Sequence, residues 1–296
     1  GGKALKLGAK AGKDDDSFIR QLRQEGQVVA PMEKGAGGAA MRAAQVQEQA
    51  LKREPVHIRT DERLVAEVSR DGGLKTGDIF GAVSLSVAAP QFTTVAMQMH
   101  NKSADSGANV QIQVHPNMDK NEWASSALLK LKSAGKPFPV NNDVSVLKWR
   151  ATLADEDGLP IVFNVWPQEA PDGCQVNIEY TLQRDDMALQ DVVVTVPLPA
   201  STTPVVAECE GSYEYQKSRN QLVWMIPVID ASNATGTLEF VTPNGTADHF
   251  FPVSVKFTAK ELLIDIGVEG VQSMDGAEDV QYSAFTNFIV DKYEIV

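Results

Sequence analysis

The four histidines, His57, His100, His115 and His249, are the side chains best suited to acid–base chemistry or metal binding near neutral pH. They are scattered along the chain, and His100 and His115 each end a strand-like run of alternating apolar residues. We therefore expect these two in exposed strand or turn positions. Their spacing does not favour the alternative, a metal site that gathers histidines from distant segments.

Two acidic runs and one Gly/Lys-containing stretch resemble ion-binding motifs but lack essential parts. Asp14–Asp16 and Asp155–Asp157 do not have the alternating spacing of a calcium loop, and a helix start and a solvated turn account for them. Residues 7–14 resemble a phosphate-binding loop, but Leu7 replaces its first glycine and Asp14 replaces the hydroxyl residue that would bind magnesium. Neither pattern predicts a site.

Motifs of known enzyme classes are missing from the sequence. It contains no Gly-x-Ser-x-Gly, no His-Glu-x-x-His, no dinucleotide-binding fingerprint and no paired Cys-x-x-Cys. We predict that the chain has no catalytic residue, no cofactor site and no metal site, and that it is not an enzyme. The alternative, a hydrolase built on a β-sandwich, requires His115 or His249 beside carboxylates in a deep pocket.

The cysteine content and the start of the chain favour a cytoplasmic protein. Cys174 and Cys209 are the only cysteines, and we predict two buried free thiols. An extracellular adhesion module would instead pair them and carry sugar at the sequons of Asn101, Asn233 and Asn244. No apolar run approaches the roughly 18 residues that span a membrane. The start lacks Met, so we expect a fragment or a processed chain.

The charge of the chain is divided unevenly at Pro55. The formal net charge is −12, from 27 Lys and Arg against 39 Asp and Glu. Residues 1–55 hold 10 basic and 7 acidic residues, a net of +3, which leaves 17 basic and 32 acidic residues, a net of −15, for residues 56–296. Nucleic-acid phosphates and anionic lipids repel such a domain, so we expect neither to be a direct partner of its whole surface.

Residues 1–55 are predicted to be a linker with one short helix near 14–25. Acidic residues and a serine stand at the start of that helix, and Gly26 follows its end. An apolar stripe of Phe18, Ile19 and Leu22 has helical spacing. Twelve residues are marginal for an isolated helix, so we expect the stripe to dock on a partner or on the main domain, or else the segment to be mostly disordered. A partly helical spacer ending at Pro55 is predicted over 36–53.

From Val56 onward, apolar and polar residues alternate with a period of two. This is typical of strands with one buried and one wet face, and turn signals such as Asp157-Gly158 and Asp172-Gly173 separate the runs. About fourteen strands over this length predict an all-β fold of two linked antiparallel β-sandwich subdomains. One or two helical turns are expected at 121–132.

The tryptophans of the predicted strands, Trp149, Trp166 and Trp224, are expected in the core, and the alternative is that one of them forms a platform for a ligand. In a strand over 146–150, Lys148 and Arg150 share one face and Trp149 points to the other. Two cations on one face of an acidic domain indicate a site for an acidic segment. The alternative is an ordinary solvated strand face.

Several long segments, in order, resemble the mu-homology domain of the delta subunits of coatomer, the coat of COPI vesicles. The resemblance runs essentially end to end and includes the linker region. The segments are VHIRTDERLVAEVSRDGGL (56–74), VQIQVHPNMDK (110–120), KPFPVNNDVSVLKWR (136–150), GCQVNIEYTLQ (173–183), DVVVTVPLP (191–199), SRNQLVWMIPVIDASNATGTLEF (218–240) and NFIVDKYEIV (287–296).

The resemblance implies two β-sandwich subdomains, with the second inserted into the first. Subdomain A would comprise 56–151 and 251–296, and subdomain B would comprise 152–250. It also implies a non-enzymatic subunit that works in Golgi-to-ER retrograde and intra-Golgi transport. Such a subunit is cytoplasmic, lies peripherally on Golgi membranes and COPI-coated vesicles, and assembles with other coatomer subunits and, indirectly, with the Arf GTPase.

The resemblance further implies binding of short Trp-containing acidic motifs, carried by a tethering complex and an Arf GTPase-activating protein. The alternative is a clathrin-adaptor-type medium subunit that binds Tyr-based sorting signals. In our alignment, however, the aromatic residue and the Asp of that Tyr pocket fall on His57 and Arg59, and the Trp and Arg of its last strands fall on Ser283 and Phe285. The charge is inverted, so we expect no binding of Tyr signals.

An acidic peptide needs a local cluster of cations on a domain of net −15. The candidates for this peptide-binding site are His57, Arg59, Lys148 and Arg150. The helix stripe of Phe18, Ile19 and Leu22 is the candidate for a second, partner-docking surface.

Overall fold

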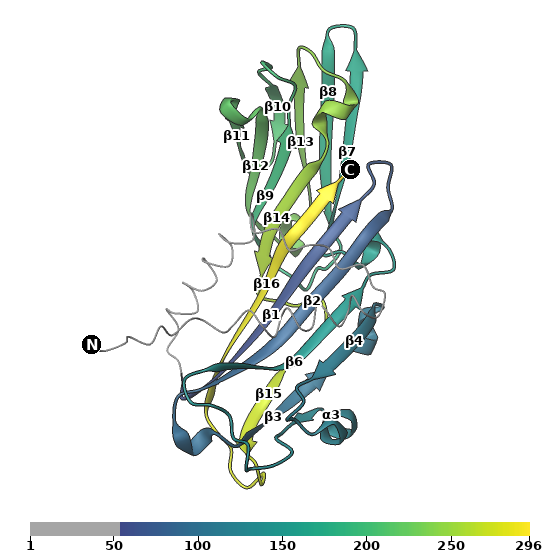
Figure 1. Ribbon diagram of the computed structural model, residues 1–296. Helices are drawn as coiled ribbons and strands as arrows, with labels where there is room; N and C mark the ends of the chain where they lie inside the picture. The colour runs from purple at the N-terminus through teal and green to yellow at the C-terminus, as the bar shows by residue number, and fades with distance from the viewer. Residues whose placement is uncertain (1–53) are drawn as a thin grey trace, which may run out of the picture. The chain divides into compact units, whose positions relative to one another are not determined.

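The structure is a computed structural model, and it describes residues 54–296. These residues form sixteen strands, one α-helix and six short 3-10 helices (Figure 1). The strands are β1 (Val56–Val68), β2 (Leu74–Val87), β3 (Val95–Asn101), β4 (Asn109–Val114), β5 (Leu128–Leu129), β6 (Asp143–Thr152), β7 (Ile161–Ala170), β8 (Gly173–Leu182), β9 (Leu189–Pro197), β10 (Val205–Cys209), β11 (Ser212–Gln216), β12 (Gln221–Ile229), β13 (Thr235–Thr242), β14 (Val253–Ala259), β15 (Ile266–Ser273) and β16 (Tyr282–Ile295). The helices are α3 (Lys120–Ser126), η1 (Pro90–Phe92), η2 (Ser103–Ser106), η3 (Glu156–Gly158), η4 (Lys217–Arg219), η5 (Ala231–Asn233) and η6 (Ala247–Phe250).

The strands form three sheets, which confirms the all-β prediction. The largest has nine strands in the order β11-β12-β9-β14-β16-β1-β2-β6-β4. The second has four strands in the order β10-β13-β8-β7, and the third has three in the order β15-β3-β5. Paired strands are antiparallel except for β1 and β16, which run parallel through a register of thirteen residue pairs.

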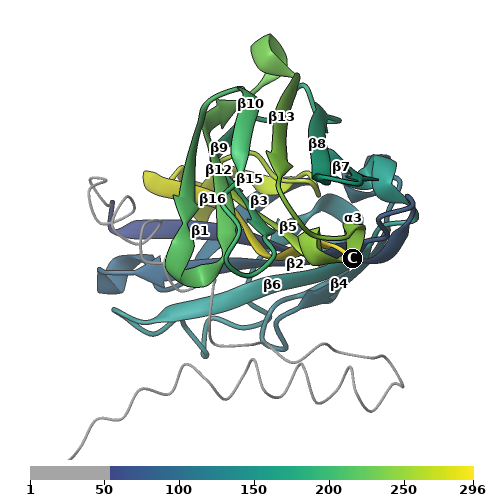
Figure 2. The same ribbon diagram turned by 90° about the horizontal axis from the view of Figure 1, so that it is seen from above.

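The sheets stack in layers around one continuous apolar core. The four-stranded sheet covers the β12–β9–β14 part of the large sheet, and the three-stranded sheet lies against the part formed by β1, β2 and β6 (Figure 2). Aromatic rings join the first two layers: Phe163 of β7 and Tyr180 of β8 meet Trp224 of β12 at centroid distances of 6.5 and 5.8 Å.

The predicted subdomain B, residues 152–250, contributes to two of these sheets. All four strands of the four-stranded sheet come from it, and so do β9, β11 and β12 of the nine-stranded sheet. The large sheet therefore runs continuously across the expected boundary between the two subdomains. The division of the chain at 151/152 and 250/251 stays a prediction.

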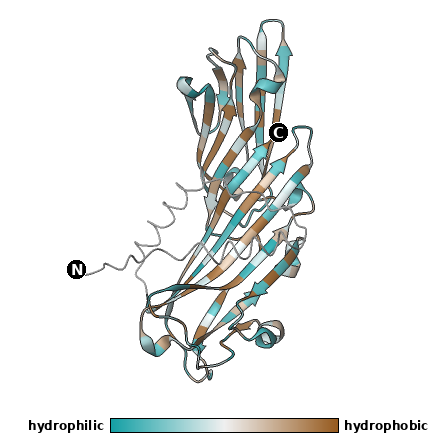
Figure 3. Ribbon diagram, in the orientation of Figure 1, coloured by the Kyte–Doolittle hydropathy of each residue, from teal (hydrophilic) through white to brown (hydrophobic). Residues whose placement is uncertain are grey.

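Hydrophobic and hydrophilic residues alternate along many strands (Figure 3). In β1 the buried positions also alternate with partly exposed ones, as the period of two indicated. Trp149 and Trp224 are 1% and 0% exposed, so their predicted core positions are confirmed. The prediction for Trp166 is wrong, because this side chain is 48% exposed. It is paired with Asn177 on the outer face of its sheet, while the neighbouring Val165 takes the buried position.

The one or two helical turns predicted at 121–132 are present as helix α3, which has seven residues. Helix α3 begins after Asp119, whose side chain accepts hydrogen bonds from the backbone N–H groups of Asn121 and Glu122. It ends at Ala127, which adopts a left-handed conformation with φ of 52°. Strand β5 follows immediately at Leu128.

Cys174 and Cys209 are both free thiols, as predicted, although Cys209 is only partly buried. They lie on β8 and β10, with β13 between these strands. Burial raises the pKa of both thiols above the ordinary value. None of the helices within residues 54–296 is long and apolar enough to cross a membrane.

Candidate functional site

The structure brings the four predicted peptide-binding residues to one face of the nine-stranded sheet. His57 and Arg59 lie on β1, and Lys148 and Arg150 lie on β6. Strand β2 separates these strands, so their backbones are about 10 Å apart. Side chains that are paired across a sheet share a face, and the pairing through β2 puts all four residues on the same one.

Arg59 is held by a carboxylate on its own strand and lies over an aromatic ring. Its Nε and Nη2 atoms donate hydrogen bonds to the two carboxylate oxygens of Asp61, at 2.6 and 2.9 Å. Its guanidinium carbon is 5.8 Å from the ring centroid of Phe285 on β16. The paired carboxylate and the ring together fix the plane of the guanidinium group.

Arg150 has the same arrangement on the other side of β2. Its Nη2 and Nε atoms donate to one carboxylate oxygen of Asp78, at 2.9 and 3.3 Å. Its guanidinium carbon is 5.7 Å from the ring centroid of Phe80. Trp149 points to the opposite side of β6 and is buried, so the predicted division of these side chains between the two faces is confirmed.

Two arginine–phenylalanine stacks thus lie on this face. Along the strand direction, Lys148 lies between them, because it is paired with Ala82 of β2, whereas Arg59 is paired with Ser84 and Arg150 with Phe80. Arg63 of β1 joins them beside Phe80, and its Nη1 atom is 3.9 Å from a carboxylate oxygen of Asp291. We call the surface of Arg59, Arg63, Lys148 and Arg150 the cationic face. Arg59, Arg63 and Arg150 each lie beside a carboxylate, and the face gathers four cations on a domain whose formal charge is −15.

His57 is buried beside the cationic face. It is 5% exposed, and its Nδ1 atom is 2.8 Å from the hydroxyl oxygen of Ser283. In the parallel register, His57 is paired with Ser283 and Arg59 with Phe285. The positions that we aligned with a Tyr pocket therefore do lie together. They hold a His–Ser hydrogen bond and an Arg–Phe stack, and Arg59 stands where the aligned Tyr pocket has an Asp that accepts the tyrosine hydroxyl.

The predicted partner-docking stripe of Phe18, Ile19 and Leu22 lies outside the described residues. Within residues 54–296, no group of three or more His, Cys, Asp or Glu side chains is arranged to hold a metal ion. The expected exposure of His100 and His115 is partly met, since both are half-buried. His100 forms an ion pair with Asp265, with 2.7 Å between its Nε2 atom and a carboxylate oxygen.

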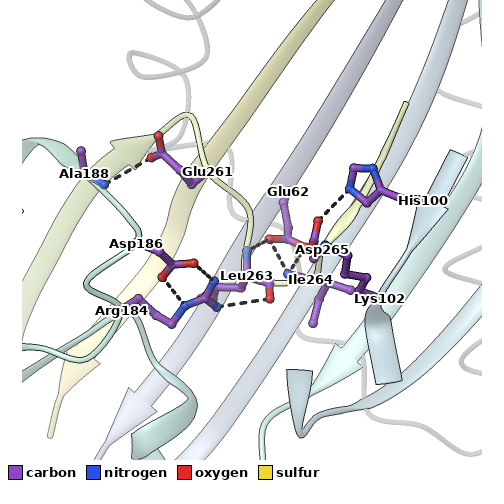
Figure 4. Close-up of polar contacts among 10 residues, drawn as sticks. All are labelled: Glu62, His100, Lys102, Arg184, Asp186, Ala188, Glu261, Leu263, Ile264 and Asp265. Carbon is purple, nitrogen blue, oxygen red and sulfur yellow. Dashed lines mark hydrogen bonds and ion pairs between the residues drawn. The ribbon is translucent and has the colours of Figure 1, made fainter. Parts of the chain in front are cut away.

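Sequence reasoning missed a buried carboxylate beneath the cationic face. Glu62 occupies an inward position of β1 and is 0% exposed. Its carboxylate accepts a hydrogen bond from the Nε1 atom of Trp149 at 2.9 Å. It also accepts hydrogen bonds from the backbone N–H of Leu263 at 2.7 Å and from that of Ile264 at 3.3 Å (Figure 4). An acidic residue on the apolar half of an alternating strand was the signal that could have revealed it.

The segment that Glu62 holds, residues 260–265, contacts several elements (Figure 4). Glu261 accepts the backbone N–H of Ala188, and Asp265 pairs with His100 of β3 and with Lys102. The Nη1 atom of Arg184, in the loop between β8 and β9, is 3.5 Å from the carbonyl oxygen of Leu263. Glu62 thus anchors, from β1, the segment near which all three sheets meet.

The stability of the protein is expected to depend on the ionisation of Glu62. Burial raises the pKa of Glu62 to about 7, against the opposing effect of the N–H groups of Trp149, Leu263 and Ile264. A carboxyl group with a raised pKa binds its proton more tightly in the folded chain. Protonation of Glu62 therefore adds to the free energy of unfolding. This contribution is fully present below the ordinary pKa of 4.5 and is lost as the pH rises to about 7.

The loss should reach about 3 kcal/mol, since one pKa unit corresponds to about 1.4 kcal/mol. The measurement is urea unfolding of the wild type and of Glu62→Gln at several pH values across this window. We expect the stability of the wild type to fall relative to that of the variant. Parallel pH curves would show that Glu62 does not titrate there.

Comparison with known proteins agrees with this fold. Residues 43–295 match the model of the adaptor complexes medium subunit family. The chain is 52% identical, over its whole length, to a probable coatomer subunit delta from Caenorhabditis elegans and covers 57% of that protein. It is 32% identical, over 98% of its length, to coatomer subunit delta from Dictyostelium discoideum and covers 52% of it. The chain thus spans about half the length of the curated relatives it matches.

Solved structures show the same fold. A yeast delta-COP-I mu-homology domain superposes with a TM-score of 0.71 at 22% identity, covering 83% of this chain and 100% of that one. The same yeast domain complexed with a Dsl1 WxWxV peptide gives a TM-score of 0.70 at 22% identity and the same coverage. The described residues have a mu-homology fold, and the family model covers most of the sequence: the chain belongs to the adaptor complexes medium subunit family.

Proposed function

We propose that this chain is a peptide-binding module of a COPI coat subunit and that its ligands are short acidic segments containing tryptophan. The observation that carries the proposal is that a yeast domain of the same fold binds a WxWxV peptide of Dsl1. The delta subunits of coatomer to which this chain is similar, and the adaptor medium subunits, are coat components and not enzymes. Binding without chemistry is therefore the function that fits.

The cationic face offers the chemistry that such a peptide requires. An indole can stack on a guanidinium group or pack against phenylalanine, and the stacks of Arg59 and Arg150 supply both surfaces. Acidic residues that flank the tryptophan would be attracted by Lys148 and Arg63 at short range. One buried indole contributes roughly 2–3 kcal/mol, so two give micromolar affinity after the loss of peptide entropy.

The wider role follows from the resemblance to delta subunits. We propose that the module works within the coat together with other coatomer subunits, in Golgi-to-ER retrograde and intra-Golgi transport. Its peptides would belong to a tethering complex and to an Arf GTPase-activating protein, and the Arf GTPase would act on it indirectly through the coat. It would lie peripherally on Golgi membranes and COPI-coated vesicles.

Charge reversal on the cationic face should weaken peptide binding. We expect an acidic peptide with two tryptophans to bind the chain with micromolar affinity in calorimetry. Arg59→Glu and Lys148→Glu should each lower that affinity about tenfold or more, since each replaces an attraction by a repulsion. A peptide with a Tyr-based signal should give no heat, because the pocket positions hold Arg59 and a buried His57.

The matched control is Lys217→Glu on η4, which makes the same charge change beside β11 and β12. It should leave the affinity within about twofold. No heat with about 100 μM peptide would contradict the proposed function. Equal losses in Lys217→Glu and Arg59→Glu would show that only the net charge matters, and would remove the cationic face as the site.

A further inference from the structure

The outer face of the four-stranded sheet exposes large apolar side chains. Trp166 of β7 is 48% exposed, whereas the tryptophans of the nine-stranded sheet are at most 1% exposed. Val205 of β10 and Val241 of β13 are 64% and 41% exposed, and they are paired directly across the two strands. This face is therefore apolar at both margins.

The same sheet carries only negative charge. Its four strands contain Glu169, Glu179, Glu208 and Glu239 and no Lys, Arg or His. Within residues 54–296, none of the four forms an ion pair. Neutral groups bind three of them: Gln175 donates to Glu239, Asn177 donates to Glu179, and the backbone N–H of Ala247 donates to Glu169.

Two of these glutamates stand directly opposite each other. Glu208 of β10 is paired with Glu239 of β13, and Glu239 is paired in turn with Asn177, the partner of Trp166. Like charges placed directly across a sheet are destabilising. Since the sheet has no cation of its own, a cation from outside would relieve this repulsion.

We propose that this surface, the acidic face of Trp166, Val205, Glu208, Glu239 and Val241, docks an extended segment of a partner protein that carries Lys or Arg. A cation of that segment stacks on the ring of Trp166. Further cations meet Glu239 and Glu208, and an apolar residue covers the two valines. Charge complementarity selects this occupant, because an acidic or neutral segment would leave the opposed glutamates uncompensated.

The spacing of the face indicates the length of the segment. Trp166 and Val205 are three strand spacings apart and two residues apart along the strands. This places them about 16 Å from each other, which about five extended residues span. Strand β7 is an edge strand, but Pro167 follows Trp166 and has no N–H to donate. The segment therefore lies across the face rather than adding to the edge.

This inference is separate from the proposed function. The cationic face belongs to the nine-stranded sheet and attracts acidic peptides, and the acidic face belongs to the four-stranded sheet and attracts basic ones. Charge reversal of Arg59 or Lys148 should not weaken binding of a basic peptide. If one of the two peptides fails to bind, binding of the other can therefore still be measured.

The test uses a fluorescein-labelled octapeptide, Arg-Gly-Arg-Lys-Arg-Val-Leu-Gly, titrated with the chain by fluorescence polarisation at about 50 mM salt. We expect saturable binding that weakens at least fivefold at about 300 mM salt. Trp166→Ala should raise Kd about fivefold, and the double variant Glu208→Gln/Glu239→Gln about tenfold. A peptide with Glu in place of every Arg and Lys should not bind.

The matched controls are Tyr213→Ala and Glu214→Gln on β11, because Tyr213 is also 48% exposed and stands beside an acidic residue. They should leave Kd within about twofold. The proposal is overturned if these controls weaken binding as much as Trp166→Ala, which would indicate unspecific attraction to an acidic domain. It is overturned equally if no saturable binding is found up to about 1 mM chain. Circular dichroism of each variant confirms that it is folded.

Discussion

Replacing Glu62 with leucine is expected to lower the free energy of unfolding by about 4 kcal/mol at pH 7. The substitution removes the acceptor of three buried N–H groups, those of the Trp149 indole and of the Leu263 and Ile264 backbone. Each buried donor left without an acceptor costs about 1–3 kcal/mol, and the relief of burying a carboxyl group offsets part of the sum. Urea unfolding followed by tryptophan fluorescence measures the change.

The control for this prediction is Glu67→Leu on the same strand. Glu67 points outward and pairs with Lys292 at 3.0 Å, and such exposed pairs contribute at most about 1 kcal/mol. Amide exchange gives a second readout, since Leu263 and Ile264 should lose protection in Glu62→Leu and keep it in Glu67→Leu. If the two variants were equally stable, water or another group would have to replace the Glu62 carboxylate. Its hydrogen bonds would then be unimportant for the stability of the fold.

The hydrogen bonds of the buried Glu62 carboxylate also affect the proposed binding surface. Strand β1 carries Glu62 inward and Arg59 and Arg63 outward, so one strand links the buried network to the cationic face. Glu62 also holds Trp149, whose neighbours Lys148 and Arg150 belong to the same face. A rigid sheet loses little entropy when a peptide binds. The buried carboxylate thus helps to keep the cationic side chains in a fixed arrangement.

The period of two predicted much of the fold because burial on one side of a sheet leaves a direct trace in the sequence. It located the strands, and it separated Trp149 from Lys148 and Arg150 correctly. Alternation says which residues share a face, but not whether another layer covers that face. Trp166 is an example. Val165 and its neighbours fill the inner face of its sheet, and the indole lies on the outer face, where it is partly exposed.

Long-range pairing was the other part that local patterns did not predict. Strand β16 lies parallel to β1 although more than 200 residues separate His57 from Ser283. Nothing in the alternation of either segment distinguishes a parallel neighbour from an antiparallel one. The network of Glu62 depends on the same kind of contact, since its partners come from β6 and from residues 263–264. Only the inward position of an acidic residue pointed to it.

Gly81→Ala is expected to be the second strongly destabilising substitution, at about 3 kcal/mol. A Cβ atom at Gly81 would lie 1.8 Å from Cε2 of Trp149 and 2.3 Å from its Nε1. The indole is 1% exposed and has no free space to move into, so the clash must displace it and lengthen its hydrogen bond to Glu62. Gly270→Ala is the control, because a Cβ atom there meets nothing within 4 Å.

A double-mutant cycle tests whether Gly81 acts through the indole of Trp149. In Glu62→Leu the hydrogen bond of that indole is already lost, so adding Gly81→Ala should cost less than it does in the wild type, by about 1 kcal/mol or more. Gly270→Ala combined with Glu62→Leu should be additive within about 0.5 kcal/mol. Additive losses for Gly81→Ala would mean that its clash is relieved elsewhere, by movement of β2 rather than of Trp149. Coupling would show that the close approach of β2 to β6 at Gly81 holds the indole against the carboxylate.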